Sequence, residues 1–204
     1  MFKTAKCFYI CFQITIMKKA FFFLSILLIS QTINCQLKFK DVATAQGVDV
    51  SYGVSTYGGG VSFKDFDNDG WDDISYSSTN GKSIYFFKNV NGNFSPITFN
   101  GIDNIRRTKQ VIWVDYDNDG DNDLFVTSIN NLNAFYENDG NMNFTDISAS
   151  CGLFQVNLST YGASFGDIDN DGDLDVFIAN RDDITENQRN YLYQNENGVF
   201  IDIT

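Results

Sequence analysis

The chain of 204 residues has no histidine and only four cysteines, and both shortages exclude a class of structure or chemistry. Without histidine there is no imidazole general base, so Ser-His and Cys-His nucleophilic systems are excluded. Cys7, Cys11 and Cys35 fall within the first 36 residues, which leaves Cys151 alone in the remainder. No disulfide framework can therefore hold the remainder together.

Residues 1–36 contain no acidic residue and have the pattern of a secretory leader. From Met17 they run through Met-Lys-Lys, then an apolar stretch of about a dozen residues, then a polar exit. Met17 is the expected start, and the mature protein is expected to be secreted or displayed at the cell surface, without stable membrane insertion after leader removal. A membrane anchor and a lipoprotein attached through Cys35 stay open as alternatives.

Acidic residues concentrate in three loops with the pattern Asp-x-Asp-x-Asp-Gly-x-x-Asp, about fifty residues apart. Carboxylates at loop positions 1, 3, 5 and 9, with a glycine at position 6 that can reverse the chain, make an oxygen cage for a hard cation. We expect this cation to be Ca²⁺, about three per chain, with the backbone carbonyl at position 7 as a further ligand. The candidate metal ligands are Asp65, Asp67, Asp69, Asp73, Asp115, Asp117, Asp119, Asp123, Asp167, Asp169, Asp171 and Asp175.

Simple acidic turns are the alternative, because Asp, Asn and Gly are common in hairpin loops. Three copies in one phase argue against it, since each gathers like charges that repel without a counterion. An EF-hand is excluded because position 12 holds Tyr76, Val126 and Ile178 in place of glutamate, and because the flanks are β-like. Thrombospondin-like calcium arrays and dockerins are also excluded, because their repeats are shorter and use cysteines or helices that this sequence does not offer.

The net charge of −12 has a local origin. The three loops hold more than half of the 26 acidic residues, and the rest of the chain after residue 36 is nearly neutral. The charge therefore indicates metal sites and not a broad acidic surface for basic partners. Nucleic-acid binding is not expected, because the basic cluster of Arg106, Arg107 and Lys109 is short.

Each loop lies within a longer repeat of four short strands. Apolar strands precede and follow the loop, and a third strand, an Asn/Gly turn and a strand ending in Phe-x-x-Ile come next. The stretch 111–116 is apolar on both faces, as expected for a strand between neighbouring sheets. We therefore predict an all-β fold, a partial β-propeller of three four-stranded blades at about residues 53–100, 101–152 and 153–204.

The two ends of the repeat region predict incomplete neighbours. Residues 37–48 resemble residues 143–154, which predicts a detached N-terminal outer strand. Propellers close with about four to eight blades, so three blades indicate a fragment whose edges need further blades or self-association. A complete three-blade protein that closes by self-association is the alternative. In an isolated copy the apolar residues Val61, Phe63, Phe177 and Ile178 are expected to be only partly covered.

The loop, the Phe/Trp-x-Asp strand before it and the Asn-x-Gly-x-Phe-x-Asp-Ile strand after it resemble FG-GAP/VCBS-type calcium-binding propeller repeats. The likeness covers essentially all of residues 37–204. This family includes integrin α-subunit head domains, cartilage acidic protein and many exported bacterial proteins. The resemblance implies a propeller of seven or a similar number of blades, with calcium between the first two strands of a blade, at the twelve aspartates named above. The chain departs from it in length, since no closed ring fits.

Leader and resemblance together favour an exported calcium-binding module for adhesion, or for binding an unknown glycan or extracellular protein through loops at the blade ends. Tyr52, Tyr57 and Tyr161 are candidates for stacking on sugars, although strand tyrosines more often pack. The alternative is the propeller portion of a secreted polysaccharide lyase or hydrolase whose catalytic part is elsewhere. The chain itself is not expected to be an enzyme, because remaining acids such as Glu137 and Glu186 form no recognisable pair.

Overall fold

The computed structural model describes residues 38–53, 58–153, 157–181 and 189–204. The chain divides into two compact units, residues 1–41 and residues 42–204. The expected leader and Tyr57 lie outside the described residues. Residues 38–53 belong to no strand, so the prediction of a detached N-terminal outer strand is wrong for the described residues. Phe39 is 95% exposed and packs against no sheet that would hold such a strand. Among the described residues no helix is long and apolar enough to cross a membrane.

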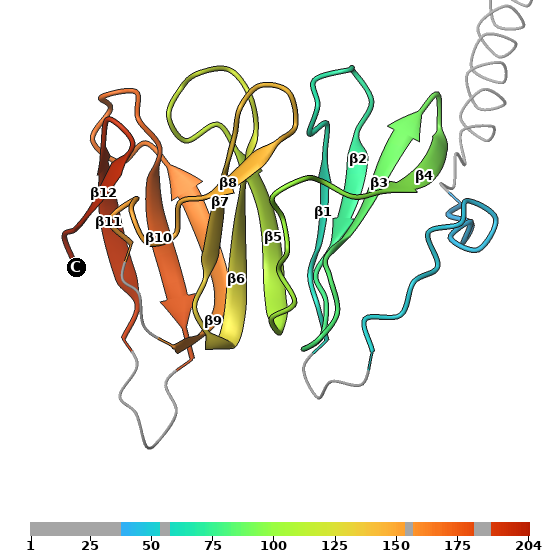
Figure 1. Cartoon of the computed structure of the whole chain (residues 1–204), viewed down its shortest axis with the longest axis horizontal. Coiled ribbons are helices and arrows are strands. Elements are labelled where there is room, and N and C mark those ends of the chain that lie inside the picture. The colour runs from blue at the N-terminus through green and yellow to red at the C-terminus, as the bar shows by residue number, and fades with distance from the viewer. Residues whose placement is uncertain (1–37, 54–57, 154–156, 182–188) are drawn as a thin grey trace, which may run out of the picture. The chain divides into compact units, whose positions relative to one another are not determined.

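The second unit is built from three groups of four antiparallel strands, called blades 1 to 3 here (Figure 1). Blade 1 consists of β1 (Val61–Lys64), β2 (Asp73–Tyr76), β3 (Tyr85–Val90) and β4 (Asn93–Ile97). Blade 2 consists of β5 (Thr108–Val114), β6 (Asp123–Asn131), β7 (Ala134–Asn138) and β8 (Phe144–Asp146). Blade 3 consists of β9 (Leu158–Gly166), β10 (Asp175–Asn180), β11 (Tyr191–Glu196) and β12 (Val199–Asp202). The described residues are thus all-β, and the predicted partial propeller is confirmed.

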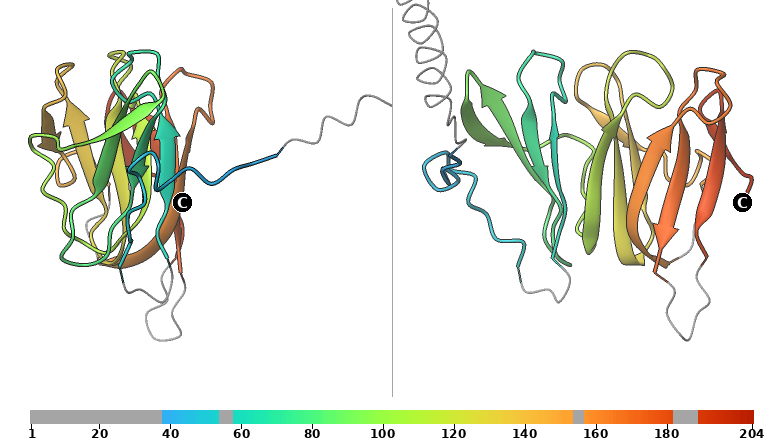
Figure 2. Two further views of the ribbon diagram at one scale, coloured as in Figure 1. Left: turned by 90° about the vertical axis from the view of Figure 1, so that its right-hand side faces the viewer. Right: turned by 180° about the vertical axis from the view of Figure 1, so that it is seen from behind.

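Within each blade the strands pair in chain order, so that β1, β5 and β9 are equivalent first strands and β4, β8 and β12 are the outer edges. Blades 2 and 3 are also joined by a short ladder between β6 and β9, through Ile129 and Ser159 and through Asn131 and Leu158. The right-hand view of Figure 2 shows the blades side by side, with the axes of most strands running roughly up and down the view.

Hydrophobic cores fill the spaces between the blades. One core joins blade 1 to blade 2 and contains Phe86, Trp113 and Leu124; the next joins blade 2 to blade 3 and contains Phe125 and Val176. Because successive strand residues point to opposite faces, Leu124 and Phe125 of β6 supply different cores, and both are fully buried. The stretch 111–116 also supplies both cores, since Val111 and Trp113 lie in the first and Val114 and Tyr116 in the second. The expectation that this stretch is apolar on both faces is therefore confirmed.

The segment after each outer strand packs into the following blade. Ile102 and Leu153 are equivalent apolar residues of the segments after β4 and β8, and Val48 is their counterpart before β1. Each packs in or against one of the hydrophobic cores. The backbone also pairs here, since the Phe144 N–H donates to the Asn100 carbonyl at 2.9 Å and the Phe200 N–H to the Cys151 carbonyl at 2.8 Å. Chain connections thus tie consecutive blades together.

Apolar side chains remain exposed on the outer faces of the first and last blades. Val61, Phe63 and Phe177 are 58%, 64% and 44% exposed, as expected for faces without a neighbouring blade. Ile178 was expected with them, and this expectation is wrong, because it is only 4% exposed. The reason is the two-residue period of a strand, which turns Ile178 into the core shared with blade 2 while Phe177 points away from it.

Candidate metal centre

The three acidic loops join the first two strands of the three blades and lie at the same end of the blades, the upper end in Figure 1. Glycines at position 6 adopt φ values of 93°, 95° and 100° at Gly70, Gly120 and Gly172, as the pattern predicts. The asparagines at position 4, which are Asn68, Asn118 and Asn170, also have positive φ, at 57°, 61° and 65°. Asn tolerates this left-handed conformation better than most residues do. Each loop therefore turns through two left-handed residues.

The aspartate at position 1 organises the interior of its loop. Asp65 accepts hydrogen bonds from the backbone N–H groups of Asp69 at 3.0 Å and Gly70 at 2.7 Å. The Gly120 N–H donates to Asp115 at 3.2 Å, and the Gly172 N–H donates to Asp167 at 3.2 Å. The carboxylate thereby satisfies backbone donors that would otherwise be unpaired in the reversal.

The aspartate at position 9 fastens the loop to the third strand of its blade. Asp123 accepts the N–H of Tyr116 at 3.3 Å with one oxygen and that of Asn138 at 2.9 Å with the other. Asp73 and Asp175 accept the equivalent pairs of backbone donors. All three are 1% exposed, which is a costly environment for a carboxylate unless it is hydrogen-bonded or paired with a cation.

Positions 1, 3 and 9 bring their carboxylates together in each loop. One oxygen from each of the three lies within 4.8 Å of the others, in the sets Asp65, Asp67, Asp73; Asp115, Asp117, Asp123; and Asp167, Asp169, Asp175. Asp69, Asp119 and Asp171 at position 5, also expected as ligands, are outside these sets. Their carboxylates instead accept the N–H of the residue two positions on, at 3.0, 3.0 and 2.9 Å.

Crowding of carboxylates is most marked in the second loop. Burial, opposed by two backbone hydrogen bonds, raises the pKa of Asp123 to about 7. Burial, together with the charges of Asp119, Asp117 and Asp115, raises the pKa of Asp121 to about 6. The pKa of Asp117 is also raised, by burial and by Asp119. A group of carboxylates that resist ionisation together is one that a divalent cation would stabilise.

Three buried carboxylate oxygens in these loops make no hydrogen bond within the described part of the chain. They are Asp67 Oδ1 in the first loop and Asp115 Oδ1 and Asp121 Oδ1 in the second. Buried polar atoms normally have a partner, so an orphaned acceptor points to an ion or a water. Since all three are anionic oxygens inside an acidic loop, the donor set fits a hard cation such as Ca²⁺.

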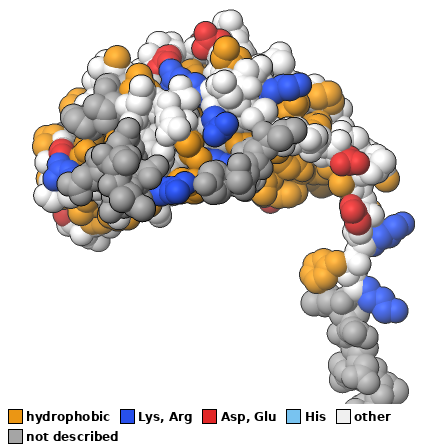
Figure 3. All heavy atoms as spheres, turned by 90° about the horizontal axis from the view of Figure 1, so that it is seen from below, with side chains coloured by type: hydrophobic (Ala, Val, Ile, Leu, Met, Phe, Trp, Pro, Cys, Tyr) orange, Lys and Arg blue, Asp and Glu red, His pale blue; other side chains and the backbone are white. Residues whose placement is uncertain are grey.

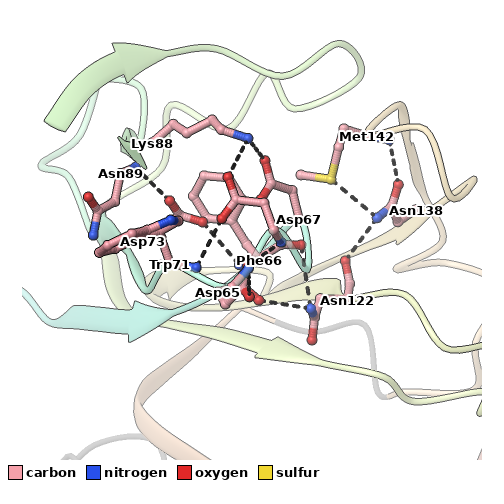
Figure 4. A network of polar contacts seen from close by, with 12 residues as sticks. Asp65, Phe66, Asp67, Trp71, Asp73, Lys88, Asn89, Asn122, Asn138 and Met142 are labelled. Carbon is pink, nitrogen blue, oxygen red and sulfur yellow. Dashed lines mark hydrogen bonds and ion pairs between the residues drawn. The ribbon is translucent and has the colours of Figure 1, made fainter. Parts of the chain in front are cut away.

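Polar contacts also link each loop to the loop of the next blade. The Asn68 side chain donates to the Gly120 carbonyl at 3.3 Å, and the Asn118 side chain donates to the Gly172 carbonyl at 3.2 Å. Asn122 reaches back from blade 2 and donates to the Asp65 carbonyl at 3.1 Å, as Figure 4 shows. The three loops are therefore parts of one connected rim.

Sequence reasoning missed one asparagine in each third strand, Asn89, Asn138 and Asn195, called the anchor asparagines here. Each donates its backbone N–H to the aspartate at position 9 and its side-chain amide to the carbonyl at position 8. The anchor asparagines are buried. Their signal in the sequence is an asparagine in the same place in all three repeats, just before the Asn/Gly turn.

The opposite end of the blades has a different character, with lysine and arginine side chains in the middle of the face shown in Figure 3. Lys109 lies over the rings of Tyr52 and Tyr161, with Nζ 5.3 and 5.9 Å from their centroids. Burial lowers the pKa of Lys109, and the charge of Arg107 lowers it further. The Tyr52 hydroxyl donates to the Thr108 carbonyl at 2.9 Å. These two tyrosines, candidates for sugar stacking, thus both contact Lys109 in this structure.

A cavity of about 260 Å³ opens beside Tyr52 and is also lined by Tyr76, Tyr85 and Val61. Its lining is largely aromatic, and its volume lies just below the roughly 300–1,000 Å³ of typical small-ligand sites. Nothing charged lines it among the residues that the structure describes. Its chemistry therefore points to no particular ligand.

Comparison with protein families gives a match to the model described as FG-GAP-like repeat, at residues 65–126 and again at residues 115–178. Each match begins at the acidic loop of one blade and ends in the strand that directly follows the acidic loop of the next blade. No curated protein matches the chain.

Proposed function

This chain belongs to the FG-GAP-like repeat family, and we propose that it acts as a calcium-binding β-propeller module that presents its blade ends to a glycan or an extracellular protein. The repeats of this family form β-propeller-like modules that are generally non-catalytic. The observation that carries the proposal is the convergence, in every blade, of three carboxylates whose oxygens lie within 4.8 Å of one another. The orphaned oxygens of Asp67, Asp115 and Asp121 support it, because a cation would satisfy them.

Calcium suits these loops better than magnesium does. Ca²⁺ accepts irregular cages of six to eight oxygens, whereas Mg²⁺ demands a smaller octahedral shell and retains its waters. Here the aspartates at positions 1, 3 and 9 would supply carboxylate oxygens, and bound calcium would supply the positive charge that the clustered carboxylates lack. The aspartates would hold the loop in place whether or not the ion is present, since those at positions 1 and 9 also accept backbone hydrogen bonds.

Isothermal titration calorimetry of the chain with CaCl₂, repeated with MgCl₂, tests the proposal. We expect saturable calcium binding with dissociation constants of about 10⁻⁴ to 10⁻³ M, as in extracellular modules, and much weaker magnesium binding. Triple replacement of Asp115, Asp117 and Asp123 by asparagine preserves side-chain size and should remove one binding site. Absence of calcium binding at millimolar concentration would refute the proposal.

We propose, further, that the protein is exported by the leader at residues 17–36. The supporting pattern is the basic start, apolar core and polar exit. A reporter fused behind these residues should leave the cytoplasm and lose them. A reporter that stays in the membrane with the segment attached would support an anchor instead, and acylation at Cys35 would support a lipoprotein.

A further inference from the structure

The third strand of each blade carries, directly before the anchor asparagine, a residue whose charge differs between the blades. This residue is Lys88 in β3, Glu137 in β7 and Gln194 in β11. Because each anchor asparagine holds the aspartate at position 9 of its loop, the residue before it occupies the same place beside each loop. The three blades thus place a cation, an anion and a neutral amide at one structural position.

In blade 1 this residue is already bound to the acidic loop. The Lys88 ammonium forms an ion pair with Asp67, at position 3 (Figure 4). It forms a second ion pair with Asp69, at 3.0 Å. Lys88 Nζ donates a hydrogen bond to the Asp67 carboxylate, so the ammonium lies between two carboxylates of the loop. One oxygen of Asp67, an expected calcium ligand, is thereby taken by a side chain of the protein itself.

The equivalent residues in the other blades bring no positive charge. Gln194 donates a hydrogen bond to Asp169, which is again position 3 of its loop. Glu137 stands in β7 directly before Asn138, whose backbone N–H donates to Asp123 at position 9 of the second loop. Glu137 therefore adds a carboxylate to a loop that already holds five aspartates.

Position 7 also differs between the loops. It is Trp71 in the first loop but Asp121 and Asp173 in the second and third. Asp121 is one of the residues with an orphaned buried oxygen. The first loop carries Asp72 at position 8 instead, so each loop holds five aspartates. The residue before the anchor asparagine therefore makes the difference in charge: Lys88 leaves the first loop the least negative, and Glu137 makes the second the most negative.

We infer that the residue before the anchor asparagine sets the calcium affinity of its loop. Lys88 acts as a built-in counterion in the first loop, so calcium binds to the second and third loops only. Of these two loops, the second binds calcium more tightly. This inference rests on the proposed function. It revises the expected stoichiometry from about three calcium ions to two. The physical reason is that a cation entering the first loop must displace an ammonium from Asp67 and then remain beside it.

Calorimetry of the full chain with CaCl₂ distinguishes this inference from the proposed function. The native chain should bind two calcium ions, and Lys88→Gln, which copies the residue of blade 3, should bind three. Three ions bound by the native chain would overturn the inference and leave the proposed function standing. No calcium bound by either protein would overturn both.

The converse substitution tests the same idea in a different loop. Glu137→Lys should weaken the tighter of the two native sites by at least about tenfold, because it places an ammonium beside position 3. Glu137→Gln is the matched control and should weaken that site less. Equal affinities in Glu137→Lys and Glu137→Gln would overturn the inference.

A local probe identifies which loop responds. Terbium luminescence excited through tryptophan should rise in Lys88→Gln relative to the native chain, because Trp71 lies in the first loop, and the added signal should be lost in Lys88→Gln with Trp71→Phe. In EDTA, Lys88→Gln should unfold at a lower temperature than the native chain. Added calcium should bring its unfolding temperature back to that of the native chain. A loss that calcium does not restore would show Lys88 to be merely structural and would overturn the inference.

Discussion

The Asn118 side-chain amide donates to the Gly172 carbonyl oxygen at 3.2 Å and so joins the acidic loop of blade 2 to that of blade 3. It also donates to Asp173 at 3.0 Å. These hydrogen bonds place a neutral donor between two clusters of negative charge. The loops are therefore coupled structurally, and a change in one is expected to reach its neighbour.

Asn118→Gly should lower the free energy of unfolding by about 1 kcal/mol relative to a matched substitution, because it removes these hydrogen bonds while glycine accepts the positive φ. The matched control is Asn170→Gly, since Asn170 has a similar φ of 65° at the same loop position in the last blade. Urea denaturation of both variants measures the difference. Equal losses would mean that the link between loops contributes nothing.

Calcium removal should destabilise the native protein, because clustered carboxylates lose their counterion and no disulfide compensates. With calcium at 100 times the dissociation constant, each site should contribute about 2.7 kcal/mol to the unfolding free energy. Differential scanning calorimetry in EDTA and in millimolar calcium measures the shift. Identical unfolding temperatures in the two buffers would contradict this prediction.

The effect of Asp117→Ala on protein stability should have opposite signs in the absence and in the presence of calcium. In EDTA it removes one of the repelling charges near Asp119, and the variant should be at least as stable as the native protein. In millimolar calcium it removes a ligand, and the variant should be less stable. Thermal unfolding in both buffers checks the crossover, and a loss of equal size in both would indicate a purely structural role for Asp117.

Cys151 should be inert in the folded protein. It is 3% exposed, and burial raises the pKa of its thiol, so little thiolate is present at neutral pH. Iodoacetamide treatment followed by peptide mass spectrometry should show no modification at Cys151 in native buffer and full modification in denaturant. Rapid native modification would mean that the core between blades 2 and 3 opens readily.

Gly152→Ala should be among the most damaging substitutions in the chain. Its φ is +91°, and a Cβ there would lie 2.3 Å from the Phe200 carbonyl oxygen, where the connecting segment pairs with β12. Gly47→Ala is the control, because its φ of +70° is also unfavourable but a Cβ there meets nothing within 4 Å. We expect Gly47→Ala to lower the free energy of unfolding by about 1–2 kcal/mol, from backbone strain alone, and Gly152→Ala to lower it by clearly more. Chemical denaturation measures both.

Much of the fold was predictable because its determinants are local. The tandem strands, the acidic loops and the positive φ at Gly70, Gly120 and Gly172 follow from residue spacing and from the backbone freedom of glycine. The convergence of positions 1, 3 and 9 also follows from one loop pattern repeated three times. Nearby residues impose these features on one another, so the sequence is sufficient to predict them.

The contacts that distinguish one loop from another were decided only by the tertiary structure. Lys88 is 21 residues from Asp67 in the chain, and Asn118 is 54 residues from Gly172, yet each pair is in contact. Similarly, Ile178 was expected to be exposed because it lies in the last blade, but its position in the strand turns it into the core. The sequence by itself determined that there are three acidic loops on a repeated β-scaffold. The packing of strands against one another decided which charges meet at each loop, because that depends on how hairpins from distant segments align.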